Sequence, residues 1–141
     1  MALDNIIGIA GTALNAQMVR MNSIASNIAN ASTVTSTEQE AYRAKRPVFR
    51  ALVEERMTHA GARHVGGVKV DRLADDNSPV RRVYEPNNPL ANADGFVFQS
   101  NVSEVSEMVE MMAASRSYQN NVEVSNTARQ LLMRTIELIR S

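Results

Sequence analysis

The fold is decided by residues 3–31, which have the sequence LDNIIGIAGTALNAQMVRMNSIASNIANA. Nine of these residues recur at alternating spacings of four and three, and eight of the nine are apolar; they are Leu3, Ile7, Ala10, Leu14, Gln17, Met21, Ile24, Ile28 and Ala31. An apolar line this narrow is typical of a helix that pairs with another helix in a coiled coil, not of one that covers a globular core. We therefore predict an N-terminal axial helix within residues 1–34 that requires a partner.

A second long helix is predicted at the other end of the chain, in residues 101–141. Neither glycine nor proline occurs after Gly95, and Asn101 with Glu104 three residues later resembles a capping box. A helix from 101 to 139 would be ~57 Å long, whereas a compact protein of this length is about 37 Å across. Either this helix is broken, or the subunit is elongated and completes its core with neighbours; we expect the elongated subunit. The large side chains of this helix include Val105, Met108, Met112, Tyr118 and Val122.

The middle of the chain, residues 35–100, has the composition of strands and turns. It holds all four prolines and four of the six glycines, together with short runs of alternating apolar and polar residues. These runs predict strands near 42–50, 67–73, 80–84 and 96–98, and residues 54–66 are expected to form an exposed loop. The expected fold class is mainly α with a small β insertion. Its long N- and C-terminal helices pair as a coiled coil, and the elongated subunit belongs to a helical assembly.

The charges and the cysteine count exclude several classes of function. Lys and Arg total 15, Asp and Glu also total 15, and no segment is basic enough to attract nucleic acid or an anionic membrane. Without cysteine there is neither a disulfide framework nor a thiolate metal site. His59 and His64 lie in a glycine-flanked segment without a paired carboxylate, and no nucleophile, base and oxyanion site can be assembled. We expect no enzymatic activity, no catalytic residues, no metal and no cofactor.

The N-terminus does not have the pattern of a secretory signal. It lacks a basic region, carries Asp4 where positive charge is expected, and is interrupted by Gly8 and Gly11. No apolar run approaches the roughly 20 residues that span a bilayer. We expect no direct membrane insertion, and two locations stay open: the cytosol, or export by a route that uses no cleaved signal.

Asparagine is unusually dense on the first helix. Asn22, Asn27 and Asn30 lie among the small residues of 21–32, although asparagine is a mediocre helix former. Small residues let two backbones approach, and a carboxamide can then donate and accept hydrogen bonds across the contact, which fixes the register of the pair. The alternative is a solvent-facing polar stripe. The residues predicted to form an assembly interface are Leu14, Met21, Ile24, Asn27, Ile28, Asn30, Val105, Met108, Met112, Tyr118 and Val122.

Both ends of the chain carry motifs that resemble one family. The N-terminal motifs are LNAQ (14–17) and MNSIASNIANA (21–31), and the C-terminal motifs are EMVEMM (107–112) and SRSYQNNV (115–122). They resemble the terminal signatures of bacterial flagellar axial proteins, the rod and hook family. In the middle, YRAK (42–45) and VYEPNNPLA (83–91), together with the short length, are most similar to the proximal-rod members of that family.

The resemblance implies a structural role. Members of this family pair their terminal helices into a coiled coil that lines an axial tube, with a β-rich insertion facing outward, and they have no enzymatic activity. They pass through the flagellar type III export apparatus without a cleaved signal peptide and assemble in the periplasmic part of the basal body. The implied partners are other rod proteins and further copies of the same chain. Heterologous contacts join them into a helical array that transmits torque.

Two other classes of function fit parts of the pattern. A helical-hairpin adaptor, or a secretion-chaperone-like protein, would also consist of paired helices, but it would be stably folded alone and would bind one client saturably. A small enzyme would require a pocket with converging polar groups in the folded monomer. The sequence favours the rod subunit because both terminal motifs belong to the same family.

Overall fold

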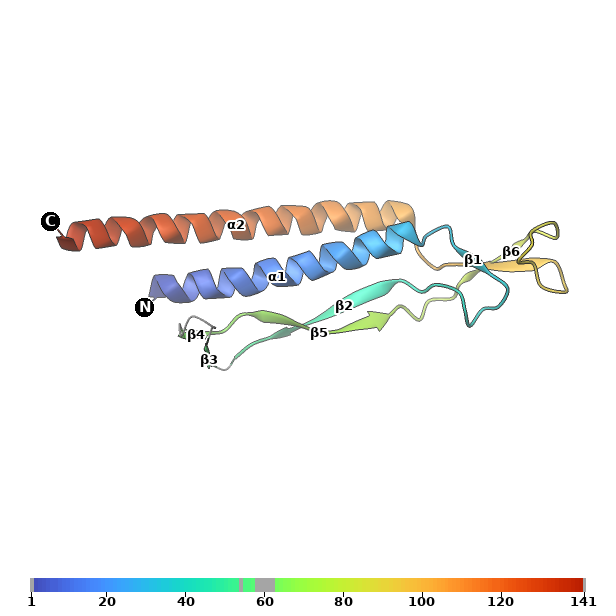
Figure 1. Cartoon of the computed structure of the whole chain (residues 1–141), viewed down its shortest axis with the longest axis horizontal. Coiled ribbons are helices and arrows are strands. Elements are labelled where there is room, and N and C mark those ends of the chain that lie inside the picture. The colour runs from blue at the N-terminus through green and yellow to red at the C-terminus, as the bar shows by residue number, and fades with distance from the viewer. Residues whose placement is uncertain (1, 54, 58–62, 141) are drawn as a thin grey trace.

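The computed structural model describes residues 2–53, 55–57 and 63–140. Two helices, α1 (Ala2–Ala29) and α2 (Glu104–Arg140), lie near the ends of the chain (Figure 1). The strands found in the described residues are β1 (Val34–Thr35), β2 (Lys45–Ala51), β3 (Glu55–Met57), β4 (Arg63–Val65), β5 (Val68–Asp75), β6 (Arg81–Tyr84) and β7 (Phe96–Gln99). The prediction of a mainly α fold with a small β insertion is therefore confirmed.

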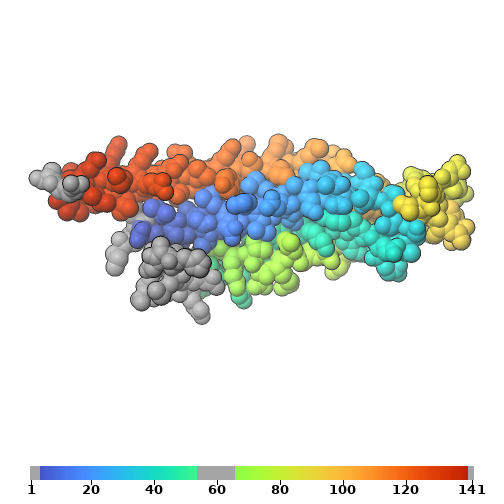
Figure 2. Space-filling model, viewed as in Figure 1, coloured from blue at the N-terminus to red at the C-terminus, as the bar shows by residue number. Residues whose placement is uncertain are grey.

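The elements form an elongated body with α1 in its middle layer (Figure 1). The helices α1 and α2 run antiparallel and side by side, and the antiparallel ribbon of β2 and β5 lies along the other flank of α1. Both termini lie at one end of the body, and the small sheet β1–β7–β6 projects beyond the opposite end. At the terminal end α2 extends further than α1, as the red part of Figure 2 shows. Thus α1 is covered on two sides, whereas α2 packs mainly on α1 and meets the ribbon near its first turn, where Glu107 contacts Arg46 of β2.

The helix α1 buries the predicted heptad positions. From Ile7 to Ala31 none of these positions is exposed, and Ile24 is only 2% exposed. A second buried line of small and polar residues includes Ser23 and Asn27. The Ser23 hydroxyl donates a hydrogen bond to the Lys45 carbonyl of β2 at 2.8 Å, so this second line contacts the ribbon. One helix therefore carries two interfaces, which explains why its small residues are so dense.

The helix α2 turns a line of mostly small and polar residues toward α1. Val105, Met108 and Met112, which stand out by size in the sequence, are instead 74%, 52% and 65% exposed. Ala114 and Ala128, which face α1, are nearly inaccessible, and their small side chains allow the two helix backbones to approach closely. The positions of this inward line again alternate by four and three, and they are Glu107, Met111, Ala114, Tyr118, Asn121, Ser125, Ala128 and Leu132.

The ribbon is fastened to α1 through Thr12. The Thr12 hydroxyl oxygen accepts a hydrogen bond from the N–H of Val68 at 3.0 Å, and the hydroxyl donates to the carbonyl of Ile9 at 2.7 Å. Gly67 has a φ of +126°, and a Cβ at this position would lie 2.7 Å from the Thr12 oxygen. Glycine is therefore required there both for its backbone conformation and for the close approach.

Part of the segment predicted as an exposed loop, residues 54–66, is a hairpin. Strand β3 pairs antiparallel with β4 in the register Glu55 to Val65 and Met57 to Arg63. The loop prediction is therefore wrong for these strands. They pair because they directly follow β2 and precede β5, whose ladder already holds the chain side by side. Glu54 and residues 58–62, among them His59, lie outside the described residues.

Candidate assembly interface

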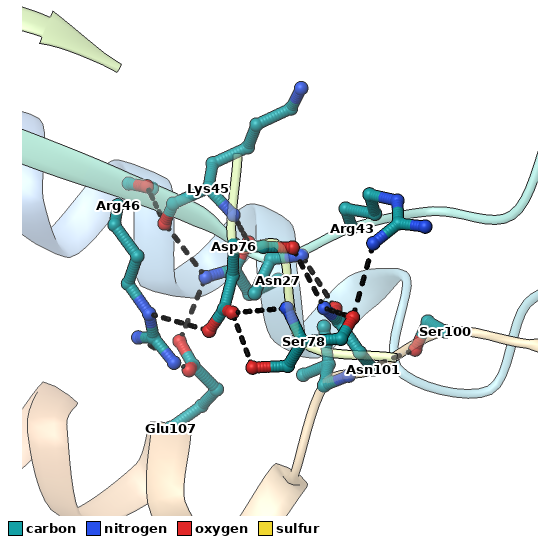
Figure 3. Close-up of polar contacts among 12 residues, drawn as sticks. Asn27, Arg43, Lys45, Arg46, Asp76, Ser78, Ser100, Asn101 and Glu107 are labelled. Carbon is teal, nitrogen blue, oxygen red and sulfur yellow. Dashed lines mark hydrogen bonds and ion pairs between the residues drawn. The ribbon is translucent and has the colours of Figure 1, made fainter. Parts of the chain in front are cut away.

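The two helices and the ribbon meet at a buried polar group centred on Asn27 (Figure 3). Asn27 is fully buried, and its carboxamide makes four hydrogen bonds. Its oxygen accepts from the N–H of Lys45 at 2.8 Å and from the hydroxyl of Tyr42 at 3.0 Å. Its nitrogen donates to the carbonyl of Lys45 at 3.1 Å and to Oε2 of Glu107 at 2.9 Å. Asn27 therefore fixes the start of β2 against α1. It also makes the hydrogen bond across the helix pair that was predicted from the high density of asparagine on the first helix.

Glu107, in the first turn of α2, is the second buried member of this group. Its side chain is fully buried, and its Oε1 lies 2.7 Å from Nη1 of Arg46 on β2. A buried carboxylate without a partner would cost several kcal/mol, and the guanidinium together with the Asn27 amide offsets that cost. Because the partners come from α1 and β2, the carboxylate is satisfied at one relative placement of the three elements. We call Asn27, Lys45, Arg46 and Glu107 the polar junction.

Asp76 extends the polar junction toward the turn after β5. Its Oδ2 lies 3.9 Å from Nε of Arg46, and its Oδ1 accepts from the hydroxyl of Ser78 at 2.6 Å and from the Ser78 N–H at 2.9 Å. The hydrogen bonds from Ser78 lower the pKa of Asp76 below its ordinary value, and the positive charges of Arg46 and Arg43 act in the same direction. The carboxylate is therefore ionised at neutral pH and holds this turn against the ribbon.

Asn101 has a different role from the predicted helix cap. The helix α2 begins only at Glu104. The Asn101 carboxamide oxygen accepts from the N–H of Ala44 at 2.8 Å, and its nitrogen donates to the carbonyls of Asp76 and Ser78, both at 3.0 Å. The capping prediction is wrong because the fold brings three backbone groups to this carboxamide.

Ser100 ties the segment that enters α2 to the end of α1. Its side chain is buried, and its hydroxyl donates to the carbonyl of Ala31 at 2.7 Å. Beside it, Ala31, Ala44 and Val102 form a small apolar cluster on which Tyr42 packs. Hydrogen-bonded polar groups and a small apolar cluster thus hold together the end of α1, the start of α2 and the start of the ribbon.

The structure divides the residues predicted to form the assembly interface into two groups. Most are buried or half-buried within the chain, and these are Leu14, Met21, Ile24, Asn27, Ile28, Asn30, Tyr118 and Val122. The other three, Val105, Met108 and Met112, are exposed. The Asn30 amide donates to the Ser26 carbonyl of its own helix at 2.8 Å and not across the contact.

Several residues of the polar junction and its surroundings were missed from the sequence. Arg46 lies in a basic cluster that is flanked by glutamates and resembles a solvated charged face, and nothing local marks Ser100 as buried. Glu107 had one usable signal, namely its place in the line of small residues that alternates by four and three along α2. That signal was hidden because a charged residue is rarely fully buried.

A cleft of about 700 Å³ opens beside the polar junction, lined by Arg20, Phe49 and Glu110 among others. The charged groups that line it are paired: Arg20 of α1 contacts Glu110 of α2, and Arg46 contacts Glu107. These ion pairs link neighbouring elements, so the charged side chains are bound to each other. We therefore interpret the cleft as a boundary between packed elements and not as a substrate site.

Two apolar surfaces of the helix pair face solvent in the single chain. The first, which we call the outer ridge, consists of Val105, Met108, Val109 and Met112 on α2, and these side chains are 52% to 74% exposed. The second is a groove of about 470 Å³ between the helices near the start of α1; its lining includes Ile6, Val124, Ala128 and Leu131. Exposed apolar surface gathered in this way is typical of interaction sites.

The last turns of α2 add further exposed apolar side chains. Met133 is 55% exposed, Ile136 is 44% exposed and Ile139 is 79% exposed. This part of α2 extends beyond α1 (Figures 1 and 2). In residues 2–53, 55–57 and 63–140, no three His, Cys, Asp or Glu side chains are grouped so as to hold a metal ion. Neither described helix combines the length and the hydropathy that a membrane crossing requires.

Comparisons with known proteins connect this architecture to one family. Residues 7–35 match the family model described as flagella basal body rod protein, and residues 93–138 match the C-terminal model of the flagellar basal body rod FlgEFG proteins. The chain is similar to the flagellar basal-body rod protein FlgC of three bacteria over 138 residues, which cover 98% of each chain. The identity is 49% for Escherichia coli O6:H1, 48% for Salmonella typhimurium and 46% for Yersinia enterocolitica. The chain therefore belongs to the FlgC family of flagellar basal-body rod proteins and is a structural subunit of the rod.

Proposed function

We propose that this subunit belongs to the proximal rod, where it assembles with other rod proteins and with copies of itself into a helical drive shaft that transmits torque. The observation that carries the proposal is the outer ridge. Its four apolar side chains are 52% to 74% exposed in the single chain, although Val105 and Val109 also line the cleft shared with β2, so they are available to neighbouring subunits. An elongated subunit with exposed apolar helix faces is suited to a heterologous contact that repeats along an axis.

We further infer that residues 1–34 and 101–141 form an axial coiled coil, with residues 35–100 as an insertion on its outer side. The support is the alternation by four and three on both helices, which is the spacing of coiled-coil contacts. The ribbon lies along α1 and meets α2 near its first turn, through Arg46 and Glu107, so most of α2 would face the axis and its neighbours. In this arrangement Val105, Met108 and Met112 contact other subunits, while Leu14, Met21, Ile24, Asn27, Ile28, Asn30, Tyr118 and Val122 shape the helix pair.

We propose that the chain reaches the periplasmic rod through the flagellar type III export apparatus, without a cleaved signal peptide. Two features suit passage in an unfolded state. The chain has no cysteine that could form a disulfide on the way. The polar junction joins segments far apart in sequence, such as Asn27 with Glu107, so the fold forms only when the whole chain has emerged.

Replacement of Met112 by aspartate tests the role of the outer ridge. Met112 is 65% exposed, so the change leaves the fold of the single chain intact, but in an assembled rod it would bury an unpaired carboxylate. We expect Met112→Asp to be exported at the wild-type level and to be depleted at least tenfold from isolated basal bodies. Met112→Leu is the matched control and should assemble normally. Incorporation of Met112→Asp at the wild-type level would show that the outer ridge is not an interface.

The alternative function, a helical-hairpin adaptor or secretion-chaperone-like protein, makes a different prediction. Such a protein would remain outside the rod and bind one client in a saturable way. Isolation of basal bodies separates the two functions, since a rod subunit co-purifies with them at a fixed ratio to other rod proteins. The exposed apolar turns at the end of α2 favour the subunit, because an adaptor that is stable alone has no need of them.

A further inference from the structure

The outer ridge carries two methionines side by side. Met108 and Met112 are four residues apart on the continuous helix α2, so their side chains are neighbours on one face. Met108 is 52% exposed and Met112 is 65% exposed. Both thioether side chains are therefore open to small molecules in the surrounding water while the chain is alone.

The residue between them provides an internal contrast. Met111 is half-buried and lies on the line of α2 that faces α1. Each step along a helix turns the side chain by about 100°, so the consecutive residues Met111 and Met112 point to different surroundings. The same chemical group is thus shielded at one position and exposed at the next.

Methionine is also the only sulfur-containing residue of this chain. The sequence has eight methionines and no cysteine. Cysteine thiolates are the usual first target of two-electron oxidants in proteins, and methionine thioethers are the other common one. An oxidant that meets the free subunit therefore finds its sulfur targets among the exposed methionines, and two of these are adjacent on the outer ridge.

We propose that the outer ridge is an oxidation-sensitive site, at which conversion of Met108 and Met112 to methionine sulfoxide keeps the free subunit out of the rod. This inference rests on the proposed function and adds a chemical control to it. The oxidant is a peroxide. Hydrogen peroxide transfers one oxygen atom to the sulfur, its O–O bond breaks, the S–O bond forms, the sulfur loses two electrons, and water leaves.

The modification would act on assembly and not on the fold. A sulfoxide is polar, and burying its oxygen in an apolar contact without a hydrogen-bond donor is unfavourable. In the single chain both side chains are more than half exposed, so the sulfoxides remain hydrated and the helix pair is undisturbed. The site is reversible, because methionine sulfoxide reductases restore the thioether.

The first test measures the reactivity of the three methionines in the purified chain. The protein is treated with limiting hydrogen peroxide, and tandem mass spectrometry measures the sulfoxide at each position. We expect Met108 and Met112 to be oxidised at least fivefold faster than Met111. In concentrated urea, which removes the fold, the three rates should become equal. Equal rates in the folded chain, or a difference that persists in urea, would overturn the site.

The second test measures the effect on assembly. Glutamine is a polar, uncharged replacement of similar length that stands in for the sulfoxide. We expect Met108→Gln/Met112→Gln to be exported at the wild-type level and to be depleted at least tenfold from isolated basal bodies. Incorporation of this variant at the wild-type level would overturn the inference.

A third measurement links the oxidant to the ridge. Cells that are building new rods are exposed briefly to hydrogen peroxide, and for each variant the incorporation of newly made chain is divided by its incorporation without peroxide. This ratio should fall severalfold for the wild type and for the matched control Met111→Leu. It should stay near one for Met108→Leu/Met112→Leu, in which the ridge cannot be oxidised. Equal ratios for all three chains would contradict the proposal.

The outcomes separate this inference from the proposed function. If Met112→Asp is excluded from rods but Met108→Gln/Met112→Gln is incorporated, the oxidation-sensitive site is wrong and the rod role stands. Absence of the wild-type chain from isolated basal bodies would overturn the proposed function itself.

Discussion

The two ends of the helix pair are built on opposite principles. At one end the polar junction buries a carboxylate and a carboxamide, Glu107 and Asn27, which are held by hydrogen bonds and by the ion pair with Arg46. At the other end α2 extends past α1 and exposes apolar side chains such as Ile136 and Ile139. The polar end is paired within one chain, whereas the apolar end leaves large side chains exposed to solvent.

The difference shows how a subunit can be both well defined and ready to assemble. Buried polar groups contribute little net stability but penalise wrong arrangements, so they set the angle and register of the elements they join. Exposed apolar faces do the reverse, since they tolerate several arrangements and gain stability from whatever covers them. We infer that the polar junction sets the shape of the subunit and that the apolar surfaces of α2 supply the energy of assembly.

The largest expected effect is at the polar junction. Glu107→Ala removes a fully buried carboxylate and leaves Arg46 and Asn27 without their partner. Arg46 is 43% exposed and keeps Asp76 nearby, so its charge stays solvated. The cost therefore comes mainly from the Asn27 amide that loses its acceptor and should be about 2–3 kcal/mol in the free energy of unfolding. Urea denaturation of the purified chain, followed by circular dichroism, measures this cost. Glu137→Ala, an exposed glutamate on the same helix, serves as the control and should change the value by less than ~0.5 kcal/mol. Equal effects for the two variants would mean that the polar junction does not organise the subunit.

A smaller effect is expected at the edge of the same region. Ser100→Ala leaves the buried carbonyl of Ala31 without the hydroxyl that it accepts from at 2.7 Å. The cost of such an unsatisfied group is about 1–2 kcal/mol, measurable in the same denaturation experiment. Ser106→Ala, at an exposed position of α2, should be close to neutral. A neutral Ser100→Ala would place the end of α1 outside the cooperative unit.

At the apolar end the effect on the single chain should be smaller still. Ile136→Ser changes a side chain that is 44% exposed, so the free energy of unfolding should move by less than ~0.5 kcal/mol. Incorporation into basal bodies should nevertheless fall several-fold, because the lost apolar contact belongs to the assembled state. A variant that lowers stability and assembles normally would reverse the roles assigned to the two ends.

The pH dependence at Asp76 should be the least visible effect. A lowered pKa means that Asp76 stabilises the fold at neutral pH, and that this contribution is lost as the pH falls through the folded-state pKa, below about 4. Ser78→Ala removes the 2.6 Å hydrogen bond and should raise the pKa of Asp76 toward its ordinary value. The stability difference between wild type and variant should therefore be constant above about pH 5 and shrink in more acid solution. An NMR titration of the Asp76 carboxyl checks the direction, and an unchanged pKa in Ser78→Ala would contradict it.

The sequence predicted the helices and strands better than the faces they bury. The heptad line of α1 was recognised because its residues are apolar, and every described position of it is at least half-buried. The inward line of α2 was not recognised, because it includes the polar residues Glu107, Asn121 and Ser125. The more hydrophobic residues of the helix lie on another face. A face defined by small size and hydrogen bonding gives little periodic apolar signal.

Long-range partners explain the remaining errors. The local sequence around Asn101 suits a helix cap. In the folded chain, however, its carboxamide forms hydrogen bonds with backbone groups of Ala44, Asp76 and Ser78, which are distant in sequence. Arg46 looked like one charge of a solvated face, and its buried partner lies 61 residues away. Such pairings depend on tertiary structure, so local propensity could not reveal them.

Hydrogen exchange in the free subunit and in isolated basal bodies tests the contrast between the two ends most directly. Backbone amides near Ile24–Ile28 and in the first turns of α2 should be protected in both states, because the polar junction is complete in one chain. Amides of residues 131–140 should exchange rapidly in the free subunit at low concentration and become protected only after assembly. Protection of residues 131–140 in the free subunit equal to that of the polar junction would contradict the assignment of the apolar end to assembly.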